Sequence, residues 1–102
     1  NVSVYDKMTN AEKEVADLLR DLGIFWQYEK PIYVQDENNR PRVWTPDFYL
    51  KKFGIYVEVC GSINFNYDYR KKIYHRNGYK VIFLHIYKRK KTWKQHFIRY
   101  LK

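Results

Sequence analysis

The chain has 102 residues, of which 45% are hydrophobic and 30% charged. This length and hydrophobic content suffice for one modest core, so we expect a single domain over residues 1–102. Its apolar runs are too short to span a membrane, no signal peptide opens it, and its one cysteine and three scattered histidines exclude an internal disulfide and argue against a structural zinc site. The formal net charge of +9 is large for this length and favours a polyanionic partner.

The clearest predicted element is a helix that begins near residue 10. Thr9 and Glu12 have the spacing of a capping box, in which the Thr9 side chain caps the helix and the Glu12 side chain bonds back to the N-cap backbone. Gly23 stands where a glycine commonly ends a helix. The residues between them form one apolar stripe at helical spacing: Ala11, Val15, Leu18, Leu19 and Leu22.

Three strand-like segments follow this helix. Residues 24–34 are rich in aromatic and β-branched side chains and are broken by Pro31, and residues 36–39 have the composition of a turn. Residues 43–50 form the second predicted strand, in which Pro46 implies an edge position or a bulge. Residues 55–60 form the third strand and are expected to pair with the second as a hairpin.

The last third of the chain is predicted to alternate between helix, strand and helix. Residues 67–77 look helical, residues 79–86 are almost continuously apolar and predict a buried strand, and a helix resumes near Arg89. The predicted order is α-β-β-β-α-β-α. A hairpin followed by a helix and a further strand predicts an α/β fold with a small mixed sheet flanked by helices.

The charges are segregated along the chain. Residues 1–69 contain 8 Lys/Arg and 11 Asp/Glu, whereas residues 70–102 contain 12 Lys/Arg and no acid. A segment of one sign indicates a nucleic acid partner, bound through phosphate contacts and counterion release. Compositional drift of the kind an A/T-rich genome favours is the alternative, but it does not account for the absence of acids.

Two carboxylates stand out by their positions on the predicted hairpin. Asp47 follows Pro46, and Glu58 lies within the third strand on the face of Tyr56 and Cys60. An acid in an apolar strand is costly unless it is paired or bound to a metal. Two carboxylates on neighbouring strands can share one Mg²⁺ ion, so the pair predicts a metal site. The alternatives are a turn acid beside proline for Asp47 and an edge-strand salt bridge for Glu58.

The two acids and their neighbours resemble the signature of a nuclease superfamily. Pro46–Asp47, then ten residues, then Glu58–Val59–Cys60 resembles the PD-(D/E)xK motif, and the αβββαβ order is similar to the restriction-endonuclease-like core of that superfamily. The segment up to Leu84 is similar to a narrower branch, which includes very-short-patch repair endonucleases and homing endonuclease catalytic domains of the EDxHD kind. The positions that match this branch are Gly61, Asn64, Asp68, Arg70 and Gly78–Tyr79.

The resemblance implies an Mg²⁺-dependent endonuclease that hydrolyses phosphodiester bonds of double-stranded DNA, with Mn²⁺ as a substitute ion. Asp47, Glu58 and the backbone carbonyl of Val59 would hold the metal. Glu14 would reach it through water, although by helical periodicity alone Glu14 is equally well a solvated helix acid. The resemblance also assigns catalytic roles to Asn64 and Asp68.

The chain departs from the signature at two positions. The signature lysine should stand where this chain has Cys60, a residue whose ordinary role is to pack in a core. Relatives often carry the lysine on the next helix, so Lys71 or Lys72 is expected to steady the charge on the scissile phosphate. The histidine of the branch is replaced by Asn64. These losses leave open a domain that binds DNA or RNA without cutting it.

Basic residues of the last two helices are expected to contact phosphates, which contributes affinity but no sequence specificity. The favoured interpretation is the catalytic domain of a homing or mobile-element endonuclease, cytoplasmic and nucleoid-associated; a nicking DNA-repair endonuclease and a basic protein-interaction domain are the alternatives. A double-strand cut predicts a homodimer, and the first residue, Asn1, is compatible with a piece of a longer chain that carries a separate recognition domain. The predicted phosphate contacts are Arg70, Arg76, Lys90, Lys91 and Lys94.

Overall fold

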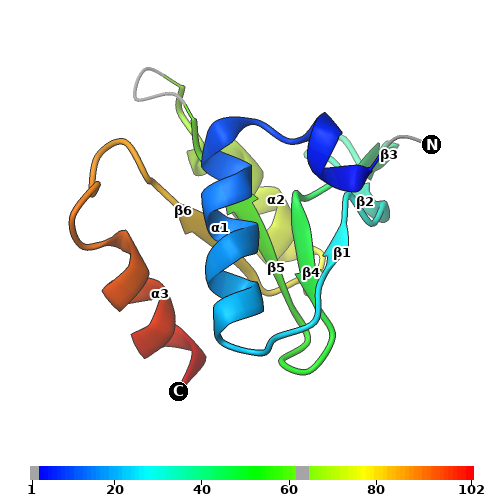
Figure 1. The fold of residues 1–102 in the computed structure, drawn as a ribbon. Coiled ribbons are helices and arrows are strands. Elements are labelled where there is room, and N and C mark those ends of the chain that lie inside the picture. Colours follow the sequence, from blue (N-terminus) through cyan, green and yellow to red (C-terminus); the bar gives the residue numbers. More distant parts are fainter. Residues whose placement is uncertain (1–2, 62–64) are drawn as a thin grey trace.

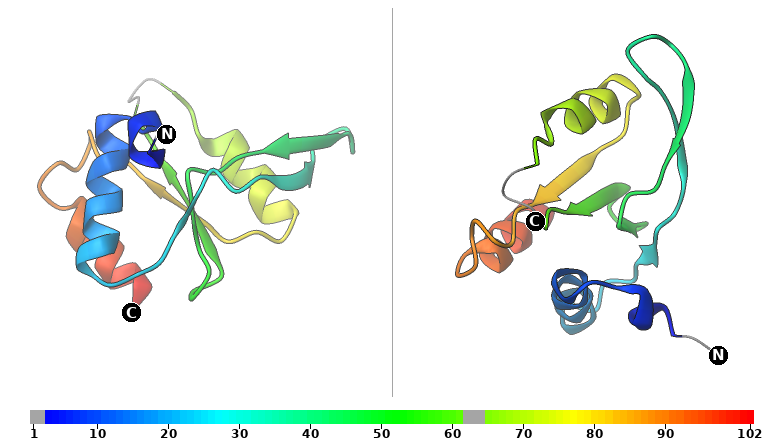
Figure 2. Two further views of the ribbon diagram at one scale, coloured as in Figure 1. Left: turned by 45° about the vertical axis from the view of Figure 1, so that its right-hand side comes forward. Right: turned by 90° about the horizontal axis from the view of Figure 1, so that it is seen from above.

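The computed structural model describes residues 3–61 and 65–102, which form a mixed α/β fold. Helices cover both faces of a central sheet, with α1 and α3 on one side and α2 on the other (Figures 1 and 2). In chain order the elements are the 3-10 helix η1 (Val4–Lys7), α1 (Asn10–Asp21), β1 (Gln27–Tyr28), β2 (Ile32–Gln35), β3 (Pro41–Trp44), β4 (Phe48–Leu50), β5 (Ile55–Val59), α2 (Asp68–Arg76), β6 (Val81–Leu84) and α3 (Trp93–Leu101).

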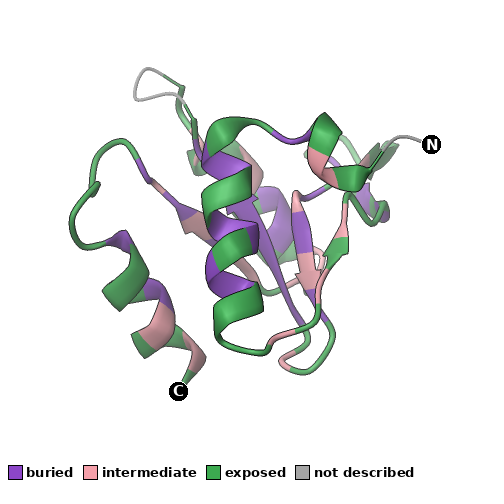
Figure 3. Cartoon of the chain, in the orientation of Figure 1, coloured by how far each residue is buried: buried purple, intermediate pink, exposed green. Residues whose placement is uncertain are grey.

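Helix α1 begins where the capping box predicts. The backbone N–H of Glu12 donates to Thr9 Oγ1 at 3.2 Å, and the backbone N–H of Thr9 donates to Glu12 Oε1 at 2.8 Å. Gly23 has a φ of +70°, a conformation that glycine adopts at little cost, so the chain leaves the helix there. The predicted apolar stripe faces the sheet and is buried, except for Leu22, which is exposed (Figure 3).

The four-stranded sheet has the order β1-β4-β5-β6. Strands β4 and β5 form the predicted antiparallel hairpin, with Phe48 opposite Val57, and β6 pairs with β5 in parallel, with Glu58 opposite Phe83. A parallel pair needs a crossover connection, which α2 supplies on one face of the sheet. The predicted mixed sheet is therefore confirmed, and β5 is an interior strand.

Two predicted strands are each divided between two sheets. The segment 24–34 supplies β1 and most of β2, and the segment 43–50 supplies β4 and the end of β3. Within the part of the chain that the structure describes, β2 and β3 pair only with each other, in an antiparallel ribbon. Pro46 lies in the break of the second segment, because proline cannot donate to a ladder. Where a bulge was expected at this proline, the chain instead passes from one sheet to the other. The ribbon of β2 and β3 projects beside α2 (Figure 2).

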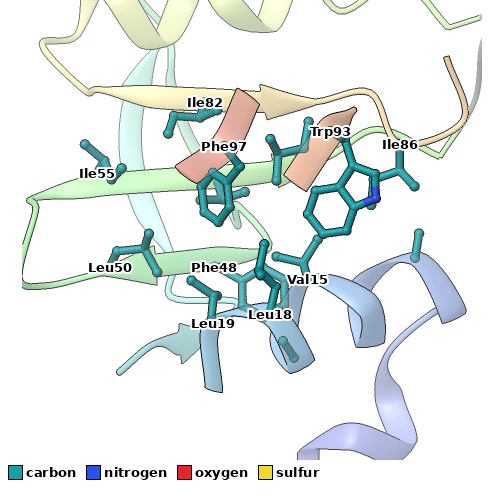
Figure 4. Packing of buried hydrophobic residues seen from close by; sticks show 14 of the residues in the cluster. Val15, Leu18, Leu19, Phe48, Leu50, Ile55, Ile82, Ile86, Trp93 and Phe97 are labelled. Carbon is teal, nitrogen blue, oxygen red and sulfur yellow. The ribbon is translucent and has the colours of Figure 1, made fainter. Parts of the chain in front are cut away.

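Apolar side chains form a core on each face of the four-stranded sheet. On one face, Trp93 and Phe97 of α3 and the buried stripe of α1 pack against the strands, as Figure 4 shows. The smaller core on the opposite face joins the ribbon to α2 and consists of Ile32, Val34, Tyr56, Ile73 and Tyr74. Among the described residues, no helix is both long and apolar enough to cross a membrane.

The docking of α3 is predicted to depend on Phe97. Its ring is buried, so Phe97→Ala should lower the free energy of unfolding by about 3–5 kcal/mol through lost burial and a residual cavity. Tyr100→Ala, on the same helix at a side chain that is 58% exposed, is the matched control and should cost less than about 1 kcal/mol. Urea denaturation measures both values. Equal costs for the two variants would contradict the packing of α3 against the sheet.

Candidate functional site

Asp47 lies immediately before β4, where backbone pairing with β5 ends. Its Oδ2 accepts a hydrogen bond from the backbone N–H of Val59 at 2.7 Å. Its own backbone carbonyl accepts a hydrogen bond from the N–H of Glu29 at 2.9 Å. The carboxylate thus bonds to β5 just beyond the last β4–β5 pair, and this half-buried side chain has its orientation set by the strand beside it.

A second carboxylate, that of Glu12, lies beside Asp47. Glu12 is in the first turn of α1 and is only 8% exposed. Its Oε1 accepts hydrogen bonds from the N–H of Thr9 at 2.8 Å and from the hydroxyl of Tyr28 at 3.1 Å. The Glu12 carboxyl also acts on the Asp47 carboxyl, whose pKa it raises both as a side-chain hydrogen-bond partner and through its charge. Two carboxylates this close repel each other unless one is protonated or a cation lies between them.

The environment of this pair raises the pKa of Asp47 to about 8. Burial is the largest cause, and the hydrogen bond with Glu12 and the negative charges of Glu58 and Glu12 act in the same direction. The N–H of Val59 acts against them, because it stabilises the ionised form. A cation that bound these oxygens would take the place of the proton, since metal ligands must be deprotonated.

Glu58 faces α2, where three donors converge on one of its oxygens. Glu58 Oε2 accepts hydrogen bonds from Arg70 Nε at 3.0 Å, Arg70 Nη2 at 2.8 Å and the Tyr74 hydroxyl at 2.7 Å. The Arg70 guanidinium also lies 4.4 Å from the ring centroid of Trp44. Because Glu58 is only 8% exposed, these bonds offset the cost of burying its charge. Glu58 Oε1 accepts no hydrogen bond from the described residues.

The acid pair predicted from the sequence is therefore engaged from two sides of the sheet. Asp47 bonds with Glu12 of α1, whereas Glu58 bonds with Arg70 of α2, and the charge of Glu58 still raises the pKa of Asp47. Within the described ranges, no group of three or more His, Cys, Asp or Glu side chains is arranged to hold a metal. Mg²⁺ does not require such a group, because it is usually bound by one or two carboxylates and keeps several waters. The oxygen donors of Asp47 and Glu12 fit that requirement.

Position 60, where the signature has a lysine, lies within reach of the charge of Lys71. Cys60 is buried, and burial first, then the charge of Glu58, raises the pKa of its thiol to about 12, so it is not an activated nucleophile. The charge of Lys71 acts on this thiol in the opposite direction, and its ammonium lies 5.7 Å from the ring centroid of Phe83, the residue opposite Glu58 on β6. Lys71 and Lys72 are both exposed, but Lys72 has no such contact among the described residues. The geometry thus favours Lys71 over Lys72.

The remaining predicted site residues lie on the surface or outside the described ranges. Glu14 is exposed on α1, Asp68 is exposed at the start of α2, and Asn64 lies outside the described residues. Arg70 is held by Glu58 and Tyr74 and is not presented as a free phosphate ligand. The other predicted phosphate contacts are exposed: Arg76, Lys90, Lys91 and Lys94.

Sequence reasoning missed three residues of this site. Glu12 was assigned only to the capping box, yet the same carboxyl also raises the pKa of Asp47. Its burial could have been read from its place beside the apolar stripe. Tyr74 stands four residues after Arg70, a helical spacing that lets both side chains reach Glu58. Trp44 comes from the ribbon, and no local pattern connects it with Arg70.

Comparisons with known proteins add no relative. No model of a known protein family matches the chain, and no curated protein and no solved structure is significantly similar to it.

The raised pKa of Asp47 predicts that Asp47→Asn stabilises the metal-free protein at high pH. A carboxyl with a raised folded-state pKa contributes stability below its ordinary pKa near 4 and loses it as pH rises towards about 8. An asparagine keeps the acceptor for Val59 and donates to Glu12 without a charge. At pH 8 in chelator, the variant should exceed wild type by at least about 1 kcal/mol, or several degrees in melting temperature.

At pH 4.5 the two proteins should differ much less, because Asp47 is then protonated in the folded state. Thermal melts of both proteins across this pH range measure the difference. A gap that does not grow with pH would contradict the raised pKa of Asp47.

Proposed function

We propose that this chain is a metal-dependent DNA endonuclease domain with a restriction-endonuclease-like core. The supporting architecture is a mixed sheet in which an antiparallel hairpin carries Asp47 and Glu58 and a crossover helix leads to a parallel strand. The proposed substrate is double-stranded DNA, and the proposed ion is Mg²⁺, with Mn²⁺ able to replace it. A homing or mobile-element endonuclease is the specific kind that we favour, with a homodimer or a separate recognition domain making the double-strand cut.

The observation that carries this proposal is the contact between the carboxyl groups of Asp47 and Glu12, with Glu58 close enough to affect it. Three acids near one another raise the free energy of the ionised state, and only one of them, Glu58, is neutralised by an arginine. If these acids served only stability, the fold would become more stable when one of them was replaced by an uncharged residue. Acids held against their own repulsion are typical of sites that bind a cation or transfer a proton.

The residues have separable roles in the proposed reaction. Asp47 and Glu12 would bind the ion through carboxylate oxygens, while the N–H of Val59 holds Asp47 in place; the carbonyl of Val59 stays a predicted additional ligand. Glu58, oriented by Arg70 and Tyr74, would add its negative charge, which already acts on Asp47. A divalent ion bound there would supply Lewis acidity toward water and the scissile phosphate.

Lys71 is the side chain that we propose for stabilising the phosphate. A lysine ammonium near the scissile phosphate lowers the energy of the charge that develops on its oxygens. Lys71 lies near Cys60, the position at which the signature has this lysine, and next to the strand residue opposite Glu58. The proposal therefore assigns to Lys71 the role that the resemblance left open between two lysines.

A non-catalytic nucleic-acid-binding module is the second candidate, and one observation favours it. Arg70 already neutralises Glu58 through two hydrogen bonds, which reduces the tendency of Glu58 to bind a cation. A module of this kind would bind DNA with the same affinity with and without metal. Cleavage assays separate it from the nuclease.

Supercoiled plasmid is expected to be nicked or linearised with Mg²⁺ or Mn²⁺ and to stay intact in chelator. Asp47→Asn and Glu58→Gln should each reduce the cleavage rate by at least about a hundredfold, because each removes charge that the reaction requires. Gel electrophoresis over a time course measures the rates. Plasmid that stays supercoiled with bound wild-type protein would favour the binding module.

Two matched pairs of variants test the new assignments. Glu12→Gln retains the capping box, which accepts Glu or Gln, but removes a proposed ligand charge, so it should abolish cleavage, whereas Glu14→Gln should leave the rate within about twofold. Lys71→Ala should slow cleavage about a hundredfold, and Lys72→Ala, which removes the same charge one residue away, should not. Equal effects within either pair would remove the assignment to Glu12 or to Lys71. Circular dichroism checks that each variant is folded.

A further inference from the structure

A cleft of about 350 Å³ opens at the carboxyl ends of the parallel strands β5 and β6. Its lining comes from the segment before α2, from the first turns of α2 and from the segment that follows β6: Phe65, Tyr67, Asp68, Lys71, His85 and Lys88. The carboxyl ends of parallel strands are where α/β folds commonly bind ligands, because the loops diverge there. Lys71 lines this cleft and also belongs to the candidate site, so the two are adjacent.

Aromatic rings form a connected series along one side of the cleft. The Phe65 and Tyr67 ring centroids are 4.6 Å apart, and Tyr67 lies 5.9 Å from Phe83 and 5.6 Å from His85. Tyr67 is anchored by these rings and by a hydrogen bond to the Cys60 thiol. Phe65, at the outer end of the series, is 54% exposed. Its apolar ring is therefore open to water while it also packs against Tyr67.

The cations of the cleft lack acidic partners among the described residues. Lys71 and Lys88 line it and form no ion pair there, although Asp68 is nearby. Burial lowers the pKa of His85, and the charges of Lys88, Lys71 and Arg89 lower it further, so several cations surround one ring. An anion placed between the two lysines would relieve this repulsion.

We propose that this cleft binds one nucleotide of an unpaired DNA strand, with the base stacked on Phe65 and the phosphate between Lys71 and Lys88. Aromatic platforms combined with a basic groove are how proteins bind single strands, since every base offers a ring face. The inference rests on the proposed function, because it places a strand beside the candidate nuclease site. It adds that the substrate has an unpaired segment.

The preference for an unpaired strand follows from the geometry of stacking. In duplex DNA each base face is covered by its neighbours, so a base reaches Phe65 only after it leaves the stack, which costs free energy. A flap, bubble or single-stranded end requires no such step. The cleft therefore favours DNA with a local single-stranded segment over continuous duplex.

Binding of a fluorescein-labelled 15-nucleotide oligothymidine and of a 15-base-pair duplex to the full chain, measured by anisotropy in chelator, tests this proposal. Phe65→Ala should weaken oligothymidine binding about tenfold and duplex binding less than twofold. The matched control is Phe25→Ala, which removes a phenylalanine that is 92% exposed and does not line the cleft, and it should change neither value. Lys88→Ala should reduce the salt dependence of oligothymidine binding by about 0.7 in slope, because one phosphate contact is lost.

Lys52→Ala, which removes a lysine from the turn before β5, should leave that slope unchanged. The cleft proposal is overturned if Phe65→Ala behaves like Phe25→Ala, if it weakens both ligands equally, or if wild type binds no oligothymidine. Plasmid cleavage by wild type reports on the nuclease separately. If wild type cleaves plasmid and Phe65→Ala binds oligothymidine normally, the cleft proposal fails and the nuclease proposal stands. If oligothymidine binding depends on Phe65 but wild type does not cleave, the cleft proposal stands and the nuclease proposal fails.

Discussion

Strand β5 pairs with neighbours on both sides, antiparallel to β4 and parallel to β6, and the rest of the structure depends on that pairing. A strand in this position is covered on both faces, so Val57 is packed against α1 and Tyr56 against α2. Glu58 shares this burial. An ionised carboxylate there is tolerated only with compensating donors, and Arg70 and Tyr74 of α2 provide them. The position of α2 is thus tied to one acid in the central strand.

The same strand holds the other half of the site. Its pairing with β4 ends at Phe48, and the next carboxylate, Asp47, bonds to the backbone of β5 instead of turning to solvent. That bond brings Asp47 to the first turn of α1, where Glu12 is already buried by its capping role. Two acids are therefore forced together by elements that are stabilised for other reasons. Proteins keep such conflicts where function requires them, because the free energy lost there is recovered elsewhere in the fold.

The basic side chains form a second charged feature of the fold. The acids of the chain end at Asp68, and the elements that follow place Lys71, Lys88 and Arg89 around His85 without acidic partners among the described residues. The acid pair that we propose to bind a cation thus lies near the basic cleft that we propose to bind a phosphate. The proposed nuclease and the proposed strand-binding cleft use these two complementary surfaces, with Lys71 at the boundary between them.

Local patterns predicted the elements well where a helix or strand is specified by its own residues. The capping box of α1, its glycine end, the β4–β5 hairpin, α2, the apolar strand β6 and a helix near the C-terminus are all present close to their predicted positions. The predicted strand 43–50 was wrong as a single strand, whereas the segment 24–34 is divided near Pro31, the proline that breaks it in the sequence. Their composition is strand-like throughout, and only pairing partners decide that each half belongs to a different sheet.

For the candidate site, the sequence by itself determined which carboxylates are unusual: Asp47 after a proline that breaks a strand, and Glu58 within an apolar one. It also determined the segregation of charge, because that property is independent of the fold. Only the tertiary structure decided that Glu12 lies close enough to act on Asp47 while Glu14 faces solvent, that Arg70 neutralises Glu58, and that the charge of Lys71 reaches Cys60. Each of these contacts joins residues from different elements, and their free energies depend on burial and distance, which no local spacing contains.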